Sequence, residues 1–310
     1  MSELFDGAVL VSIAAAMIRT ATPMLFSAMG ELVTQRAGVW NMGVEGTMLM
    51  ASFIAYLIAT LTGSLGLAIL VALLASAIMG LLIAFLTATL RVDHFIAGLG
   101  LNLLSSGLTL FWFRSYIQGR QQPTFDGFHP YPLPFLSNIP IVGPILFSQH
   151  VLTYLAFLTV PLVWYFLYRT RYGLEIRCIG ENPKALDVKG LSVPVRQYLA
   201  IVFGSVMTGL GGAFLMLGFS DRFLPEITAG RGWLVIVAII AGNWLPGRVT
   251  LALLVFALLE AIAIHVRIIG VGVPQQIFLA LPYVASIALI ALFRLRSYEP
   301  AALGVPYRRE

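Results

Sequence analysis

The chain has 310 residues, of which 59% are hydrophobic and 11% are charged, and its mean hydropathy is +0.91. A soluble domain usually carries about 25% charged residues, so this composition excludes an ordinary soluble domain and favours a polytopic membrane protein. The net charge of +5 does not indicate nucleic-acid binding, because basic residues in membrane proteins mark the cytoplasmic loops. The single cysteine, Cys178, excludes an intrachain disulfide.

Apolar runs of about 20 residues, the length that crosses a bilayer, recur along the whole chain. They cover 8–29, 44–62, 66–90, 95–113, 150–168, 197–219, 249–266 and 275–293, and a shorter run covers 233–245. The shorter run cannot cross upright, so we expect it to be tilted, broken or re-entrant. The sequence therefore predicts an all-α fold, one helical bundle over 1–310 with about nine spans, eight or ten being the alternatives.

The first run is interrupted by Arg19, and Pro23 is expected to kink it. No basic residue precedes Arg19, and a cleaved signal peptide normally has a basic beginning. We therefore expect the first run to be retained.

The most hydrophilic part of the chain is the segment 170–196, which holds both lysines, Lys184 and Lys189. If this loop is cytoplasmic and nine spans are assigned on either side of it along the chain, most basic residues lie on the cytoplasmic side of the membrane. The opposite side receives Arg114, Arg120, Arg222, Arg231 and Arg267. This bias has the sign of the positive-inside rule and predicts an inner or plasma membrane protein with an external N-terminus and a cytoplasmic C-terminus.

The loop 114–149 is expected to be external and contains six prolines between Pro123 and Pro144, with aromatic residues among them. Proline removes backbone donors and fixes φ, which predicts a rigid, non-helical cap. It either closes over a pore, offers a docking surface, or is a plain connector.

The segment 31–46 breaks the hydrophobic pattern with Arg36 and with Gly38, Gly43 and Gly46. Closely spaced glycines favour a tight backbone over a continuous helix. Irregular backbone at membrane depth is tolerated only where protein buries it or water lines it, and such breaks often form solute sites in transporters. A plain cytoplasmic turn is the alternative.

Polar residues inside the spans are further candidates. Asn102 either contributes to a solute site or packs between helices. Glu260 is costly to keep in a span, and we expect a structural pair with Arg267.

Two short patterns concern packing and helix ends. Gly204, Thr208 and Gly212 recur every four positions, which favours close helix packing. Gly230 and Gly232 flank Arg231 before the short run, where the backbone donors of a helix N-terminus favour an oxygen-rich group. The alternative is an arginine at the interface.

The stretch Glu181–Gly190 is predicted to be a short helix. Asn182 suits its N-cap, Pro183 its first position and Gly190 its exit. Ala185, Leu186 and Val188 give it an apolar side, which suits insertion into a groove of another protein. A helix lying in the lipid interface is the alternative.

The sequence lacks the motifs of common nucleotide-binding and metal-binding sites. Neither lysine is followed by Ser or Thr, so a phosphate-cradling P-loop is excluded. The four histidines, at 94, 129, 150 and 265, are scattered and form no metal-binding pattern. We therefore predict no enzyme activity, no metal and no cofactor on this chain.

Together these segments resemble a known family. QRAGVWNMGVEGTMLM (35–50) and RCIGENPKALDVKGLSV (177–193), with LNLLSSGLT and TAGRGW, are similar to the permease subunits of ABC importers. The resemblance covers about residues 20–295 and is to the ribose- and nucleoside-type branch of these binding-protein-dependent, branched-chain-like permeases.

The resemblance implies a helical bundle that pairs with a second permease, and it implies partners. These are an ATPase, often with two nucleotide-binding halves, that binds ATP and Mg, and an external solute-binding lipoprotein. The ATPase-coupling residues implied are Gly180, Glu181, Asn182, Pro183, Lys184, Ala185 and Gly190. The polar residues expected along the solute pathway are Trp40, Asn41, Glu45 and Asn102, and the structural motif residues are Arg36, Gly38, Gly43, Gly46, Gly230, Arg231 and Gly232.

The sequence motif RAGVWNMGVEG and the short N-terminus look most like nucleoside-type permeases, which commonly work with a longer second permease subunit. Simple-sugar permeases of the ribose or galactose type remain the alternative. Trp40 departs from the usual bulky aliphatic residue of the family, and it would narrow the pore or stack on a ring if it faces the pore. An ion-coupled secondary transporter, which needs acidic residues such as Glu260 in the membrane, is the alternative of another class.

Overall fold

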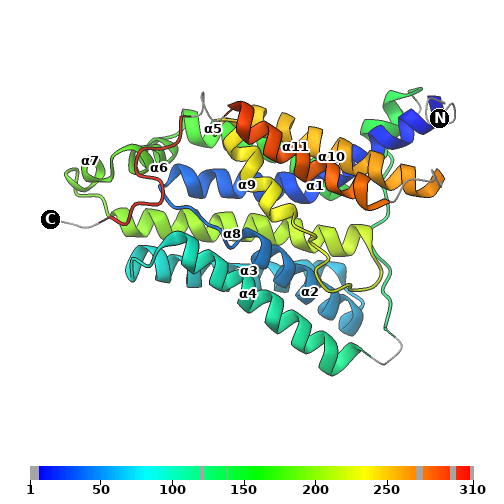
Figure 1. The fold of residues 1–310 in the computed structure, drawn as a ribbon, viewed down its shortest axis with the longest axis horizontal. Helices are drawn as coiled ribbons and strands as arrows, with labels where there is room; N and C mark the ends of the chain where they lie inside the picture. The colour runs from blue at the N-terminus through cyan, green and yellow to red at the C-terminus, as the bar shows by residue number, and fades with distance from the viewer. Residues whose placement is uncertain (1–6, 119–121, 138, 270–274, 294–297, 308–310) are drawn as a thin grey trace.

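The computed structural model describes residues 7–118, 122–137, 139–269, 275–293 and 298–307. The described part is all helical apart from its connecting segments, as predicted (Figure 1). The helices are α1 (Gly7–Arg36), α2 (Val44–Thr62), α3 (Leu65–Ala84), η2 (Phe85–Thr89), α4 (His94–Trp112), η3 (Phe113–Ile117), η4 (Gly143–Phe147), α5 (Val151–Arg169), α6 (Arg171–Glu181), α7 (Pro183–Asp187), α8 (Val193–Phe219), α9 (Arg231–Ala241), α10 (Pro246–Ile269) and α11 (Gln275–Phe293).

Each predicted apolar run coincides with a helix. Within the described residues, seven helices are long and apolar enough to cross a membrane. The remaining two runs correspond to the shorter apolar helix Arg231–Ala241 and to α11, whose apolar part is Ala280–Leu289. The first run forms a single helix, because α1 continues through both Arg19 and Pro23.

Helix α8 is the centre of the bundle and packs most extensively against α1, α3 and α2. The small-residue pattern explains this position. A side chain at Gly204 would meet Thr34 of α1, and one at Gly212 would meet the backbone of Met48 in α2. The predicted role of this pattern in close packing is confirmed, because only glycine lets these backbones approach.

Two parts of the chain have the same order of elements, a long helix, a connecting segment and a second helix, but they run in opposite directions along the bundle (Figure 1). In the first, the long helix α1 is followed by the segment 37–43 and by α2. In the second, the long helix α8 is followed by the segment 220–230 and by α9. Helices α2 and α9 both begin part-way along the bundle and run toward opposite ends. The short run is therefore the helical half of a broken span, which was one of the predicted possibilities.

The two ends of the bundle carry different segments. One end, the α7 end, carries α6, α7 and the described C-terminal residues, and the opposite end carries the start of α1 and the loop 114–149 (Figure 1). Two loop predictions need correction. The loop 114–149 is not wholly non-helical, because η3 extends α4 to Ile117 and η4 forms a further helical turn. The segment 170–196 is largely helical, because α6 occupies its first part.

Candidate functional site

Glu45 connects the N-termini of α2 and α9. It lies in the first turn of α2, and its Oε1 accepts a hydrogen bond from the Gly230 amide at 2.8 Å. Its Oε2 accepts one from the Gly232 amide at 2.6 Å. Because the first amides of a helix have no partner within the helix, a carboxylate there satisfies them and interacts favourably with the helix dipole. An oxygen-rich group was expected at this turn, and the chain's own Glu45 supplies it.

The glycines of this turn are needed for the close approach. Gly230 has a φ of +79°, a conformation that residues with a side chain rarely adopt. At Gly232, an added Cβ would lie 2.7 Å from the backbone nitrogen of Glu45. The two glycines therefore allow α9 to begin directly against α2.

Arg231 forms an ion pair with Glu260 of α10, and both side chains are 15% exposed. Its Nη1 also donates to the carbonyl oxygens of Ile227 at 3.1 Å and Thr228 at 3.2 Å. Glu260 therefore pairs with Arg231, because α9 begins inside the bundle and places this arginine there and not in the expected outer loop. The side chain of Arg267 lies outside the described residues. We call the group formed by Glu45, Gly230, Arg231, Gly232 and Glu260 the mid-depth junction.

Asn102 fastens α4 to the start of α2. Its Oδ1 accepts from the Gly46 amide at 2.8 Å, and its Nδ2 donates to the Met42 carbonyl oxygen at 2.9 Å. A side chain at Gly46 would meet Asn102 directly. Both polar ends of this half-buried side chain are therefore engaged within the chain.

Asn41 is fully buried and belongs to a chain of polar contacts beneath the segment 37–43. Its Oδ1 accepts from the Gly43 amide at 3.0 Å, and its own amide donates to Glu31 Oε1 at 3.3 Å. Glu31 Oε1 also accepts from Gln35 Nε2 at 3.1 Å, and Gln35 Oε1 accepts from Trp244 Nε1 at 2.7 Å. In this conformation the contacts of Asn41 fix the backbone of the segment.

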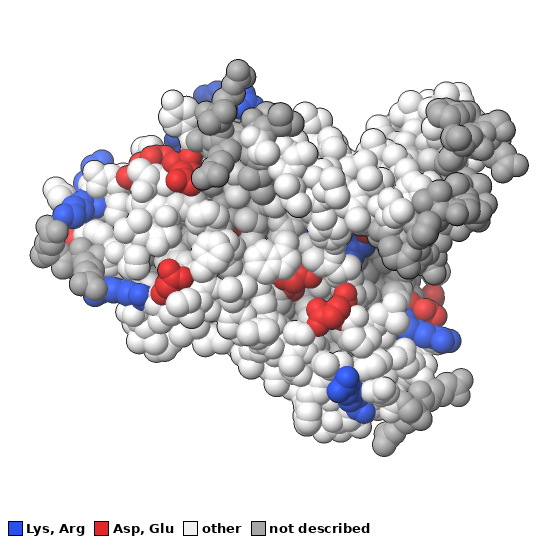
Figure 2. All heavy atoms as spheres, in the orientation of Figure 1, with Lys and Arg blue, Asp and Glu red and all other residues white. Residues whose placement is uncertain are grey.

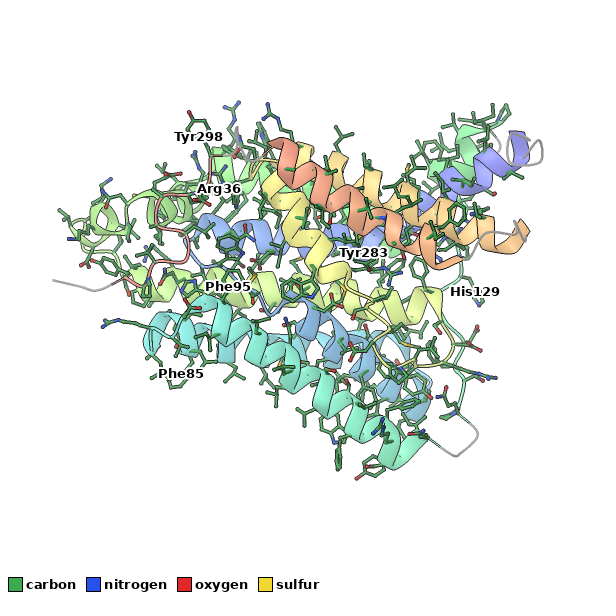
Figure 3. The ribbon with its side chains drawn as sticks, in the orientation of Figure 1. Arg36, Phe85, Phe95, His129, Tyr283 and Tyr298 are labelled. Atoms are coloured by element: carbon green, nitrogen blue, oxygen red, sulfur yellow. The ribbon has the colours of Figure 1, made fainter. Side chains whose placement is uncertain are left out.

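Trp40 is half-buried and packs against Phe95, with ring centroids 5.8 Å apart. Its amide donates to His94 Nδ1 at 3.1 Å. Trp40 therefore borders the start of α4 on the α7 side of the mid-depth junction, where Figure 3 labels Phe95. Of the four expected pathway residues, the structure brings Glu45 and Asn102 together at the start of α2 and places Trp40 and Asn41 in the segment before it.

Polar groups also lie on the surface beside the mid-depth junction. Ser106 Oγ donates to Glu226 Oε1 at 2.5 Å, and Glu226 is exposed. Ser106 is near the midpoint of the 24-residue helical span His94–Ile117. Tyr283 of α11 donates its hydroxyl to the Ala229 carbonyl oxygen and is 39% exposed (Figure 3). Figure 2 shows acidic side chains in the middle of an otherwise largely uncharged face, whereas most other charges lie toward the ends.

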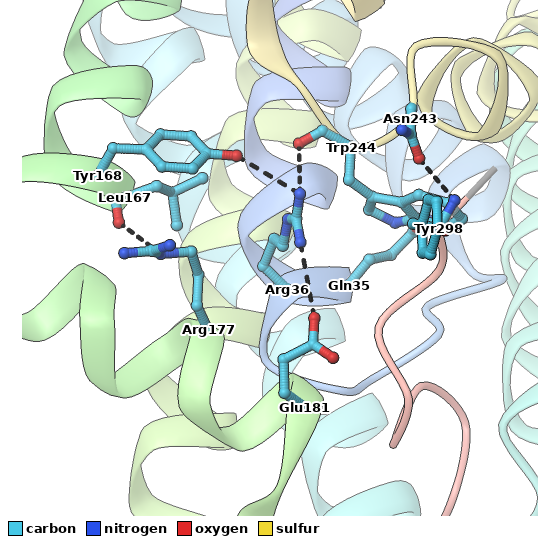
Figure 4. A network of polar contacts seen from close by, with 9 residues as sticks. All are labelled: Gln35, Arg36, Leu167, Tyr168, Arg177, Glu181, Asn243, Trp244 and Tyr298. Carbon is cyan, nitrogen blue, oxygen red and sulfur yellow. Dashed lines mark hydrogen bonds and ion pairs between the residues drawn. The ribbon is translucent and has the colours of Figure 1, made fainter. Parts of the chain in front are cut away.

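Arg36, the last residue of α1, organises the α7 end (Figure 4). Its Nη2 donates to the Trp244 carbonyl oxygen at 3.1 Å and to the Tyr168 hydroxyl at 3.4 Å. Its Nη1 lies 4.0 Å from Glu181 Oε1. Arg36 therefore joins α1 to α5, to α6 and to the connection after α9.

The short helix expected over Glu181–Gly190 exists but is shorter. Glu181 ends α6, and α7 covers only Pro183–Asp187. Asn182 caps α7 through its Oδ1, which accepts from the Ala185 amide at 3.4 Å, and Pro183 occupies the first position. Gly190 has a φ of +75° after the helix. The cap and first residues were predicted correctly, but the helix ends at Asp187, so Gly190 closes the turn after it and is not the exit residue of the helix.

Several residues of these sites were not predicted from the sequence: Glu31, Gln35, Ser106, Glu226, Trp244 and Tyr283. Glu31 carried a usable signal, because it is an acidic residue within a helical run that is otherwise apolar. The others gave no comparable signal, since their roles depend on contacts between distant segments.

The fold and these sites define a multi-pass membrane protein with interrupted spans, the architecture of a transport subunit. The family model described as "Branched-chain amino acid transport system / permease component" matches residues 13–290. The chain belongs to this permease family and is a permease component of an ABC transporter; it is not itself the ATPase.

Three relatives are similar over nearly their whole length. The putative glucose ABC transporter permease protein TsgC13 of Haloferax volcanii is 34% identical, over 95% of this chain and 97% of the relative. The nucleoside ABC transporter permease protein NupC of Lactococcus lactis subsp. cremoris is 34% identical, over 95% and 96%. The guanosine ABC transporter permease protein NupQ of Bacillus subtilis is 30% identical, over 93% of each chain.

Proposed function

We propose that this chain is the shorter permease subunit of an ATP-driven importer for nucleosides. The observation that carries this proposal is the similarity to NupC and NupQ, whose names specify nucleosides and guanosine. A simple-sugar importer is the second candidate, because TsgC13 is 34% identical and named for glucose. The proposed partners are a longer second permease, an ATPase with two nucleotide-binding halves, and an external solute-binding lipoprotein.

The solute pathway is proposed to follow the face beside the mid-depth junction. Glu226 is exposed near the middle of the span of α4, where contact with lipid hydrocarbon would be costly. This face therefore requires water or protein in front of it, as a pathway between two permeases provides. Carboxylate, hydroxyl and carbonyl oxygens there suit the hydroxyl and N–H donors of a nucleoside or sugar.

The α7 end is proposed to be cytoplasmic and to receive the motion of the ATPase. Leu186 anchors α7 in a small cluster with Ile179 and Val193, whereas Ala185 and Val188 are exposed, Val188 by 88%. An anchored short helix with exposed apolar side chains fits insertion into a groove of the ATPase. Replacement of 181–190 by a flexible linker should abolish uptake while the lipoprotein still binds solute; uptake that survives the replacement contradicts this coupling role.

The proposal is tested by reconstituting the complete importer in vesicles and measuring uptake of labelled guanosine and labelled glucose. We expect ATP-dependent guanosine uptake that unlabelled nucleosides inhibit and glucose does not. Preferential uptake of glucose would establish the second candidate instead. An uncoupler serves as a control, because uptake that persists in its presence and needs ATP excludes ion-coupled secondary transport.

A further inference from the structure

The C-terminal segment 298–307 bridges the short helices of the α7 end to the segment 37–43. The Ala302 amide donates to the Gly180 carbonyl oxygen, which lies near the end of α6, at 2.8 Å. Two residues later, the Gly304 amide donates to the Gly38 carbonyl oxygen at 3.0 Å. The segment therefore binds α6 and the first turn after α1 at adjacent positions.

Both ends of the segment have further attachments. At its start, the Tyr298 amide donates to Asn243 Oδ1 at 2.7 Å, directly after α9 (Figure 4). At its end, the Tyr307 hydroxyl donates to Asp187 Oδ2 at 2.8 Å. Because Asp187 is the last residue of α7, the segment runs from the end of α9 to the helix proposed to meet the ATPase.

Small residues keep the segment close to its partners. A Cβ added at Gly180 would lie 3.2 Å from Pro300 Cβ, and one added at Gly38 would lie 3.3 Å from the Ala302 carbonyl oxygen. Gly38 and Gly304 have φ values of +78° each. The close approaches at Gly180 and Gly38 and the positive φ of Gly304 favour glycine at each position, which indicates a fitted attachment.

We propose that the segment 298–307 positions α7 relative to the segment 37–43 and transmits the displacement of α7 to the start of α2. The inference rests on the proposed function, because it takes α7 as the point where the ATPase acts. The route is short. It passes from Asp187 through Tyr307 to Gly304 and Gly38, and the segment 37–43 then leads directly into the turn that carries Glu45.

The attachments are better suited to transmission than to stabilising the bundle. Tyr298 and Val305 are 84% and 59% exposed, so their side chains bury little apolar area. Leu303 packs half-buried on the largest core cluster, Tyr307 packs on the small cluster of Leu186, and Pro300 is buried. Hydrogen bonds at a partly exposed surface contribute modestly to stability, but in series they restrict the relative movement of the elements they join.

The test uses the complete reconstituted importer and compares the variant Gly304→Pro/Tyr307→Phe with the control Tyr298→Ala/Val305→Ala. Proline removes the Gly304 amide and cannot adopt a φ of +78°, and phenylalanine removes the hydroxyl that reaches Asp187. The control changes two exposed side chains of the same segment and keeps every one of these hydrogen bonds. Uptake, ATP hydrolysis and the amount of assembled complex are measured together, with whichever solute the unchanged importer carries.

We expect the number of solute molecules carried per ATP hydrolysed to fall about tenfold in Gly304→Pro/Tyr307→Phe, within the range of coupling between sites in proteins. The control should keep the original ratio. The inference is overturned if the ratio is unchanged, if the control falls equally, or if uptake falls only in proportion to assembled complex. An intact ratio here, together with loss of uptake on replacing 181–190, would reject this inference and leave the proposed function standing.

Discussion

The mid-depth junction and the α7 end are held by different kinds of contact. At the junction, a carboxylate binds two helix amides, and a paired arginine and glutamate are each only 15% exposed. At the α7 end, backbone hydrogen bonds hold the segment 298–307, and the Arg36–Glu181 pair is separated by 4.0 Å with the glutamate 57% exposed, although Arg196 and Glu175 form a closer pair beside it at 2.6 Å. Charge-assisted bonds away from water are expensive to break, whereas exposed pairs contribute little. The difference indicates a stiff junction and an end whose contacts can be exchanged.

The largest loss of stability is expected when one charge of the mid-depth junction is removed. Arg231→Met leaves Glu260 in the bundle without its partner, and breaking such a pair costs about 3–5 kcal/mol. The melting temperature of the purified permease in detergent, followed by tryptophan fluorescence, should fall strongly.

The double variant Arg231→Met/Glu260→Met is the matched control. It removes both charges together and should regain most of the lost melting temperature. If it melts as low as the single variant, then the bonds of Arg231 to Ile227 and Thr228 stabilise the junction and the ion pair does not.

A smaller loss of stability is expected when the hydrogen bonds between α2 and α9 at the mid-depth junction are removed. Glu45→Ala removes both acceptors of the first α9 amides, and the loss of such a helix cap costs about 0.5–2 kcal/mol. Hydrogen exchange at the Gly230 and Gly232 amides should accelerate. Glu45→Gln, which keeps one acceptor oxygen, should lie between. Glu226→Ala is the control, because within the described residues the carboxylate of this exposed acid bonds only to Ser106. An equal effect there would mean that net charge, and not capping, matters.

At the α7 end, Asn182→Ala should affect stability less and transport more. Loss of the helix cap costs about 1 kcal/mol and is confined to α7, so the melting temperature of the bundle should hardly change. ATP-driven uptake by the complete importer should fall, because α7 loses its fixed orientation. Asn182→Asp keeps an equally good cap and should retain uptake. Loss of uptake in both variants would indicate that the amide is recognised by the partner itself.

The residues that sequence reasoning placed correctly are those with local causes. Closely spaced glycines predicted the break after α1, and Asn182 and Pro183 predicted the start of α7 because capping depends on neighbours in sequence. The pairing of Glu260 with Arg231 was not foreseen, because Arg231 reaches Glu260 only through the course of the irregular segment before α9. Asn102 and Asn41 looked alike in the sequence, yet one joins two helices and the other fixes a buried turn. Such roles depend on which backbone amides lie nearby, and a single sequence does not contain that information.

The smallest effect on stability, and the sharpest test of the comparison, is expected at Glu181. Glu181→Gln removes a pair 4.0 Å apart whose acid is more than half exposed, and such pairs contribute about 0–1 kcal/mol. Arg36 keeps its bonds to Trp244 and Tyr168, so the melting temperature should stay within about 2 °C of the unchanged protein. Uptake should nevertheless fall about fivefold, the lower end of coupling between sites, because Glu181 directly precedes the cap of α7. The opposite pattern, a lower melting temperature with full uptake, would show that the α7 end is a structural support like the junction, and the distinction between the two regions would fail.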